Sequence, residues 1–406
     1  MENSNAYIRC NWFSRGYERH SASWLCARRC YSGSVRVYVL NAGSTSTKLG
    51  LAQVSATSQG GLSLNMQREE VHHPDLQAAL PGETPRDVTL RGLEALRANI
   101  AERTRDWEPP DAVAARGGLM GPVAAGTYEI TTALAQYLLS APFGIHATNL
   151  GAQAGLEWAN RFGVPAYMVD PPSVDELLPE ARVSGFPGLE RQSRFHALNA
   201  RAVARRAARE VGKRFEEAVI VVAHLGGGLS VTTFDGGRAI DTTGALLDEG
   251  PFSPQRAGAL PIRGLLDLAY SMPRPELEKR LVHNSGFKGL LGTNDLRLLA
   301  AREEGDEETR LVVTAFIHQV CKAVGAYALA STRPDAIAVT GGVSRWPELV
   351  ARLEARLRWI APVICVPGEL ELEALAEGAA RVLFGFEDPR SWTTDITHEP
   401  VTDERA

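Results

Sequence analysis

The sequence has 406 residues, enough for two or three domains of roughly 150 residues each. Lysine and arginine total 43 against 48 aspartate and glutamate, so the formal net charge is -5 and no basic surface for a nucleic-acid backbone is predicted. No run approaches the roughly 18 apolar residues of a membrane-spanning helix, and five scattered cysteines do not suggest a disulfide framework. We therefore expect a soluble, cytoplasmic protein that binds neither nucleic acid nor membrane.

The first 34 residues differ from the rest of the chain. They are rich in arginine and serine, contain only two acids, Glu2 and Glu18, and show no hydrophobic period. Such a segment is typical of a targeting peptide or of a disordered tail, and translation from an upstream start codon would also produce it. We predict that residues 1–34 form an extension outside the fold and that residues 387–406 form a second tail.

From Val35 the chain has the pattern of an α/β domain. Residues 35–40 and 47–54 read as two strands joined by a loop of small residues, which predicts a β-hairpin. The other elements expected before Pro171 are a helix at about 86–106, a buried strand at 112–115, a helix at about 131–140 and a buried strand at 166–169.

The second half of the chain repeats this beginning. After a long helix at 193–214, residues 219–224 form a strand, 225–228 a glycine loop and 229–234 a return strand. The strand, glycine loop and strand therefore occur twice, about 180 residues apart, which indicates two similar domains facing each other. We predict domains at 35–172 and 173–372, with a last helix at about 373–386 packing back on the first.

A third glycine pair, Gly341 and Gly342, follows a buried strand at 335–339 and precedes a helix that begins near Pro347. Glycines at such a position let a nucleotide phosphate approach the backbone. A single glycine loop is more often only a tight turn, but three of them at strand ends favour a nucleotide site. Neither the P-loop pattern nor the dinucleotide-binding pattern is present.

The loop from Asn41 to Lys48, with the sequence NAGSTSTK, resembles the signature of the acetokinase (acetate and butyrate kinase) family of the actin-like ATPase superfamily. The similarity runs from Val35 to Phe386. Segments that resemble the butyrate kinase branch in particular are 115–119, 146–151, 195–199, 224–228 and 249–258. The resemblance implies an α/β fold of two duplicated actin-like ATPase (ribonuclease H-like) domains with a nucleotide cleft between them.

The resemblance also implies reversible phosphoryl transfer from ATP to butanoate, giving ADP and butanoyl phosphate with Mg²⁺ as the metal. Branched-chain fatty acids, propionate and acetate are alternative substrates. A sugar kinase and a non-catalytic nucleotide-binding protein of the same fold are more distant alternatives. The partners implied are a short-chain carboxylate, its acyl phosphate and further copies of this chain in a homodimer or higher homo-oligomer.

Site residues follow from the matching motifs. The resemblance implies these nucleotide and phosphate ligands: Asn41, Ser44, Ser46, Lys48, His224, Gly226, Gly227, Gly228, Gly341 and Gly342. The implied catalytic residues are Asp170, Arg256, His196 and His146, and the implied substrate-binding residues are Arg116, Phe143 and Ile145. The implied metal residues are Asn41, Asp170 and Glu371, with Glu369 close enough in register to be the carboxylate instead.

Two positions depart from the acetate kinase pattern. Arg116 stands where that pattern has a histidine, and Gly227 stands where it has an asparagine. Both changes agree with the butyrate kinase form. The reaction itself also favours positively charged residues such as Arg116. A carboxylate acceptor is already ionised at neutral pH and needs no general base. The difficulty is the approach of an anion to a polyanion, which positive charge and hydrogen-bond donors relieve.

Overall fold

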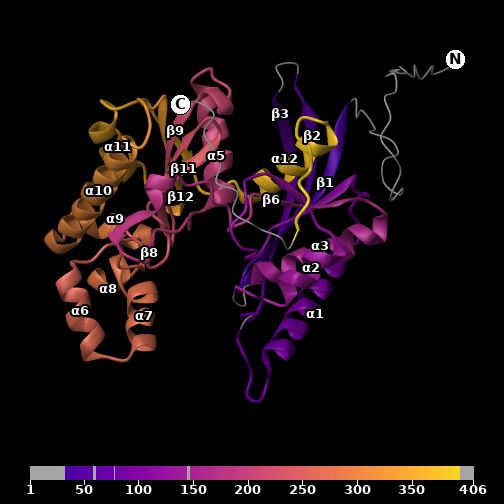
Figure 1. Ribbon diagram of the computed structural model, residues 1–406, viewed down its shortest axis with the longest axis horizontal. Coiled ribbons are helices and arrows are strands. Elements are labelled where there is room, and N and C mark those ends of the chain that lie inside the picture. The colour runs from indigo at the N-terminus through magenta and orange to yellow at the C-terminus, as the bar shows by residue number, and fades with distance from the viewer. Residues whose placement is uncertain (1–32, 58–60, 77, 144–146, 394–406) are drawn as a thin grey trace.

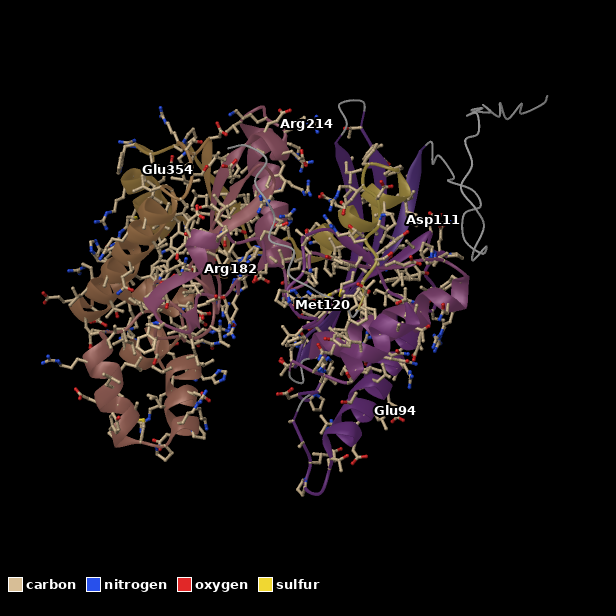
Figure 2. All side chains as sticks on the ribbon, viewed as in Figure 1. Glu94, Asp111, Met120, Arg182, Arg214 and Glu354 are labelled. Carbon is tan, nitrogen blue, oxygen red and sulfur yellow. The ribbon has the colours of Figure 1, made fainter. Side chains whose placement is uncertain are left out.

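The computed structural model describes residues 33–57, 61–76, 78–143 and 147–393. Two predicted site residues, Ile145 and His146, lie outside this part of the chain, as do 1–32 of the predicted extension and 394–406 of the predicted tail. The described chain forms two halves side by side, each built on one sheet with helices against it (Figure 1). Figure 2 labels Glu94 and Asp111 on the first half and Arg182, Arg214 and Glu354 on the second.

The first sheet has the strand order β3-β2-β1-β4-β6-β5. The predicted hairpin is confirmed, because β1 and β2 pair in antiparallel fashion, and β4 and β6 extend the sheet in parallel. The strands are β1 (Ser34–Ala42), β2 (Ser46–Ala56), β3 (Leu62–His72), β4 (Ala112–Ala115), β5 (Thr127–Glu129) and β6 (Ala166–Val169). β3 was not predicted, since it is a largely polar strand at the edge of the sheet with no buried residue.

The second sheet has the order β11-β10-β9-β12-β13 and repeats the first. In both sheets a hairpin comes first, a third antiparallel strand lies outside it, and two parallel strands follow on the other side. Its strands are β9 (Val219–Leu225), β10 (Leu229–Asp235), β11 (Arg238–Thr242), β12 (Ala336–Gly341) and β13 (Val363–Pro367). Every residue of β9 and β12 is buried, as expected for central strands covered on both faces.

Helices cover both faces of each sheet. The first sheet carries α1 (Pro85–Arg103), α2 (Thr132–Leu139) and α3 (Ala147–Phe162) on one face and α12 (Glu371–Leu383) on the other. The second carries α10 (Glu307–Tyr327) and α11 (Pro347–Leu357) on one face and α5 (Ala197–Glu210) on the other. The smaller elements are α4 (Pro179–Arg182), β7 (Val183–Phe186), β8 (Leu189–Glu190), η1 (Phe215–Glu217), α6 (Ile262–Ser271), α7 (Arg274–His283), α8 (Gly286–Leu291), α9 (Leu296–Glu303) and η2 (Gly342–Arg345).

Several helices differ from the prediction, which included neither α4 nor any of α6–α10. α5 is shorter than the expected 193–214, because Gly212 turns the chain with a φ of 72° and Lys213 N–H bonds back to the Ala208 carbonyl. α3 was not predicted at all, since its glycines lower helix propensity. One of them has a packing reason: a Cβ on Gly155 would lie 2.8 Å from the Ala115 Cβ, so the helix can approach β4 only with glycine there.

α5 and α12 are the inner helices, and they contact each other between the two sheets. Leu198 of α5 belongs to the same buried cluster as Leu372 and Leu375 of α12, so the last helix packs on the first half although it follows the second half in the chain (Figure 1). The chain beyond α12, expected as a tail from 387, also packs there: the Trp392 ring lies 4.4 Å from that of Tyr137. No helix in the described part of the chain is long and apolar enough to cross a membrane.

Candidate active site

The first two glycine loops close hairpins at the ends of β1 and β9. Asn41, the last residue but one of β1, is buried and lies opposite Lys48, and Gly43 N–H donates to the Ser46 carbonyl at 2.9 Å. In the second loop Gly226 N–H donates to the Gly228 carbonyl at 3.0 Å. The side chains of Ser44, Ser46 and Lys48 are partly exposed around the first loop, as phosphate ligands would need to be.

The third loop lies directly beside the second, because β12 pairs in parallel with β9 and ends at Gly341. Gly341 has a φ of 92°, and a Cβ there would lie 2.5 Å from the Leu225 carbonyl carbon, so only glycine fits. At Gly342 a Cβ would meet nothing within 4 Å, and at Gly227 only Gln255 Nε2 at 3.7 Å. The backbone at these two glycines is therefore open to a ligand.

Two histidines stack behind the second loop. The rings of His196 and His224 lie 3.8 Å apart and nearly parallel, at 10°. His196 Nδ1 is 3.0 Å from the hydroxyl of Ser230. The Asn199 amide donates to His224 Nδ1 at 2.9 Å, while its oxygen accepts from Leu370 N–H, and this fixes the His224 proton on Nε2. Asn199 was not predicted, although its position one helical turn after His196 is a signal that could have found it.

Both histidines are neutral at pH 7. Burial lowers the pKa of His224 to about 4 and holds the pKa of His196 well below its ordinary value, where the neighbouring His224 and Arg256 depress it further. The positive charge expected around the transferred phosphoryl group therefore comes from Arg116, Arg256 and Lys48 and not from these two histidines. The two imidazoles can serve there as hydrogen-bonding groups.

We expect the native state to lose stability as the pH falls below the pKa of about 6.5 of an unfolded histidine, because native His224 stays neutral down to about pH 4. The unfolded chain then binds a proton that the native state does not. At pH 5 this one group should cost about 2 kcal/mol. Urea unfolding at pH 7 and pH 5 measures the loss. It should be smaller by that amount in His224→Gln, and an equal loss in both proteins would contradict the assignment.

Asn41, Arg116 and Glu371 meet where β1, β4 and α12 converge. The Asn41 amide donates to Glu371 at 2.7 Å, and Arg116 Nη1 lies 3.0 Å from the same carboxylate. Glu369 lies nearby with its oxygen 3.7 Å from His224 Nε2. Burial and then Glu371 raise the pKa of Glu369, whereas Lys48, Arg116 and Arg345 lower it. Carboxylates and cations from distant parts of the chain thus share one region.

This region fits Mg²⁺. Amide and carboxylate oxygens are its preferred protein ligands, and the repulsion between Glu369 and Glu371 is what a bound cation would relieve. Among the described residues no group of three or more histidine, cysteine, aspartate or glutamate side chains could hold a metal. The ion would therefore need further oxygen ligands from a nucleotide, which is how kinases usually hold magnesium.

Arg256 lies against the second loop, beside His196. A Cβ on Gly228 would come within 2.5 Å of Arg256 Nη1 and 3.2 Å of His196 Cε1. Arg256 N–H donates to the Ser253 hydroxyl at 3.1 Å, Nη1 donates to the Ala245 carbonyl, and the buried Nε has no hydrogen-bond partner among the described residues. Burial lowers its pKa, but guanidinium remains charged at neutral pH. The Arg256 guanidinium is therefore a fixed cation, and its Nε–H is a donor that could bind a ligand.

Asp170 has a different environment from these residues. It follows β6 with a φ of 39°, is almost fully buried, and accepts from Gly126 N–H at 2.9 Å. Its carboxylate lies 3.1 Å from Arg201 Nε, without the geometry of a hydrogen bond. Its ion-pair and hydrogen-bond contacts within the described chain do not reach the glycine loops. Phe143, predicted to line an acyl pocket, is 53% exposed.

Two sheets that share a five-strand order, with glycine loops and charged side chains gathered between them, define a protein of the actin-like ATPase fold. The acetokinase family model matches residues 188–357. A probable butyrate kinase of Deinococcus radiodurans is 49% identical over 381 residues, covering 91% of this chain and 97% of that protein. The chain belongs to the acetokinase family and is a carboxylate kinase, a phosphotransferase with a carboxyl group as acceptor.

Solved structures agree on the fold. An acetate kinase of Porphyromonas gingivalis superposes with a TM-score of 0.65 at 21% identity, covering 85% of this chain and 99% of that one. A propionate kinase of Francisella tularensis gives 0.62 at 19% identity, covering 85% and 98%. The expected α/β fold of the actin-like ATPase class is confirmed.

Proposed function

We propose that this carboxylate kinase acts on butyrate, transferring the terminal phosphoryl group of ATP to give butanoyl phosphate and ADP, and that the reaction is reversible. The observation that carries the proposal is the 49% identity to a probable butyrate kinase over nearly the whole chain. The replacement of histidine by Arg116 and of asparagine by Gly227 supports the same choice.

In this proposal the glycine loops bind the nucleotide. The open backbone at Gly227 and Gly342 suits close approach of phosphate and adenosine, and Lys48 and Asn41 lie at the first loop for the transferred group. Neutral His196 and His224 donate hydrogen bonds to phosphoryl oxygens, while Arg256 offers its charge where negative charge spreads in the transition state. His146, which precedes α3, is assigned here only from the family motif.

The acceptor needs orientation and no proton removal. Butyrate is ionised at neutral pH, so its oxygen can attack in line without a base. Arg116 is the side chain we assign to that carboxylate, and its present ion pair with Glu371 holds it beside the first loop. Phe143 and Ile145 would contact the acyl chain. Closure of the two halves around both substrates would exclude water, which otherwise competes for the phosphoryl group.

Mg²⁺ would be held by Asn41 and Glu371 together with the nucleotide, and it would supply positive charge at the phosphoryl oxygens. We favour Glu371 over Glu369 because Glu371 is bonded to Asn41. Asp170, the third metal residue in the proposal, lies with Arg201 and would hold the ion through an intervening water or after a shift of its side chain. In this proposal the chain's own residues would hold the metal from β1 and α12.

Butyrate should be preferred over acetate by about 15-fold in kcat/KM, because two added methylenes contribute about 0.8 kcal/mol each when buried. An ATP-dependent acyl-hydroxamate assay over acetate, propionate, butyrate, isobutyrate and valerate measures this. Isobutyrate and valerate should fall within about tenfold of butyrate, since an apolar pocket discriminates weakly between similar shapes. Ile145→Phe should shift preference toward acetate, whereas Phe162→Tyr, outside the site, should not. A wild-type preference for acetate would contradict the butyrate proposal and leave carboxylate kinase activity intact.

We also propose two domains, 35–172 with the last helix and 173–372, and assembly into a homodimer or higher homo-oligomer. α6 supports the assembly: it has no buried residue although Ile262, Leu266 and Tyr270 are large and apolar or aromatic. Such a surface normally packs against a partner. A monomer in sedimentation at micromolar concentration would contradict the assembly.

A further inference from the structure

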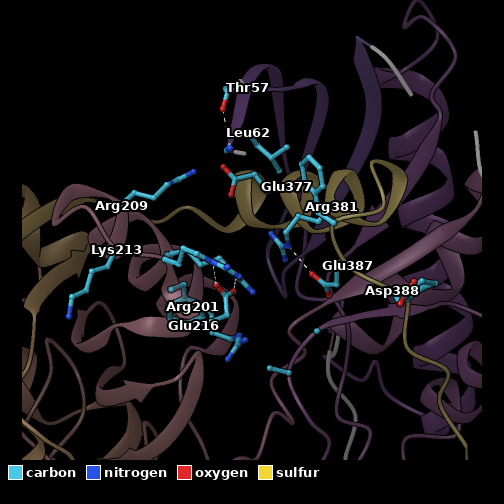
Figure 3. A pocket seen from close by; sticks show the side chains of 18 of the residues that line it. Thr57, Leu62, Arg201, Arg209, Lys213, Glu216, Glu377, Arg381, Glu387 and Asp388 are labelled. Atoms are coloured by element: carbon cyan, nitrogen blue, oxygen red, sulfur yellow. Dashed lines mark hydrogen bonds and ion pairs between the residues drawn. The ribbon is translucent and has the colours of Figure 1, made fainter. Parts of the chain in front are cut away.

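A cavity of about 1270 Å³ lies between α5 and α12, where both halves line it (Figure 3). Charges on its lining pair within the chain, as Figure 3 shows for Arg381 and Glu387, which lie 2.8 Å apart. Arg201 of the second half likewise lies 3.1 Å from Asp170 of the first. These pairs balance the charge of the lining, so this cavity gives no indication of a ligand. A different set of polar contacts, at the first glycine loop, does.

A short segment after β3, residues 73–76, crosses the first glycine loop. His73 N–H donates to the Thr45 carbonyl at 3.0 Å, and Leu76 N–H donates to the Ser44 carbonyl at 2.9 Å. Leu76 is 3% exposed and belongs to the buried core of the first half, so it anchors the segment there. The first loop is therefore held in place by residues that are distant from it in the sequence.

These bonds determine where the N–H groups of the loop point. The C=O and N–H of one planar trans peptide point in opposite directions. Because the carbonyls of Ser44 and Thr45 accept from residues 73–76, the N–H groups of Thr45 and Ser46 point away from that segment. The Thr45 N–H has no hydrogen-bond acceptor in the described part of the chain. Backbone N–H groups left open in this way are donors for phosphate oxygens.

The side chain of His73 makes a second attachment to the loop. Its Nε2 lies 2.9 Å from the Thr47 hydroxyl, and its Nδ1 lies 3.0 Å from the Pro74 carbonyl. A carbonyl can only accept, so Nδ1 carries a proton, and Nε2 of the neutral imidazole accepts from Thr47. Thr47 is completely buried, and without His73 its hydroxyl would lose this partner. An unsatisfied buried hydroxyl is costly and would favour a different conformation of the loop.

We propose that His73 and Thr47 are positioning residues, which orient the first glycine loop toward the terminal phosphate of ATP. The inference rests on the proposed function, because it takes this loop as the site of the transferred group. Lys48 follows Thr47 on the opposite face of β2, so the same pair also fixes the strand that carries this lysine. Loss of either partner should weaken contacts to the terminal phosphate and leave those made by the second and third loops largely intact.

Isothermal titration of the full chain in the presence of Mg²⁺ tests this with adenylyl imidodiphosphate, a non-hydrolysable ATP analogue, and separately with ADP. His73→Leu and Thr47→Val should each weaken binding of the analogue about tenfold and binding of ADP by less than about threefold. The double variant should bind the analogue no more weakly than either single variant, since the two residues act as one pair. His73→Gln should recover most of the affinity, because its amide oxygen can accept from Thr47.

His318→Leu is the matched control. His318 is exposed on α10 in the other half, where its Nδ1 lies 3.5 Å from Arg356 Nη2, so its loss should change neither dissociation constant by more than about twofold. The proposal is overturned if His73→Leu and Thr47→Val bind the analogue as the wild type does, if they weaken binding of the analogue and of ADP equally, or if their effects add. A wild type that binds neither nucleotide would overturn the proposed function together with this inference, whereas the other three results overturn the inference alone.

Discussion

Arg256→Ala should lower kcat by roughly 10² to 10³-fold, the size expected when one preorganised donor to a developing charge is removed. The guanidinium lies against Gly228 beside His196, and its Nε is buried without a hydrogen-bond partner in the described chain. A group held in this way can act on the phosphoryl oxygens without reorganising. ATP affinity should change less than kcat, since the interaction belongs to the transition state. Steady-state kinetics with butyrate and ATP measures both.

Arg256→Lys should recover little of the activity, because an ammonium group keeps the charge but lacks the planar fork. Arg280→Ala is the matched control. Its side chain forms an exposed ion pair with Glu276 on α7, so its removal should leave kcat unchanged. Full activity in Arg256→Ala would remove this residue from the site.

Glu371→Gln should lower kcat/KM by about 10²-fold and raise the Mg²⁺ concentration needed for half-maximal rate by about 10 to 100-fold. Glutamine keeps the size of the side chain and can still accept from Asn41, so the change isolates the negative charge. Without that charge Arg116 loses its ion pair, and the affinity for butyrate should change as well. Rates measured over a series of Mg²⁺ concentrations separate the two effects.

Glu369→Gln is the comparison variant. Glu369 contacts His224 Nε2 at 3.7 Å and does not bond Asn41, so its loss should affect the Mg²⁺ requirement by less than about threefold. If Glu369→Gln had the larger effect, the metal-linked carboxylate would be Glu369. If neither changed the Mg²⁺ requirement, the metal would not depend on the start of α12 or on Glu369 before it.

Local patterns determined much of the fold. Buried strands such as β4, β6 and β9 are short apolar runs ended by glycine or proline, and they were predicted within a residue or two. The repeated strand, glycine loop and strand also indicated the duplication that the two sheets display. α11 begins at Pro347 as predicted, because proline suits the first turn of a helix and no later one. These signals depend only on residues near one another in the chain.

Only the tertiary structure decided which distant side chains meet. Glu371 and Arg116 are 255 positions apart, and no local pattern relates them; they meet because α12 packs across β1 and β4. Tertiary contacts also explain the edge strand β3, which pairs with β2, and the glycine-containing α3, which packs closely on β4 from the opposite face. The residues of both elements look unfavourable when their neighbours in space are unknown. Asp170 shows most clearly what could not be predicted from the sequence alone. The sequence placed it at a strand end, but its left-handed backbone and the buried Arg201 decided where its carboxylate points.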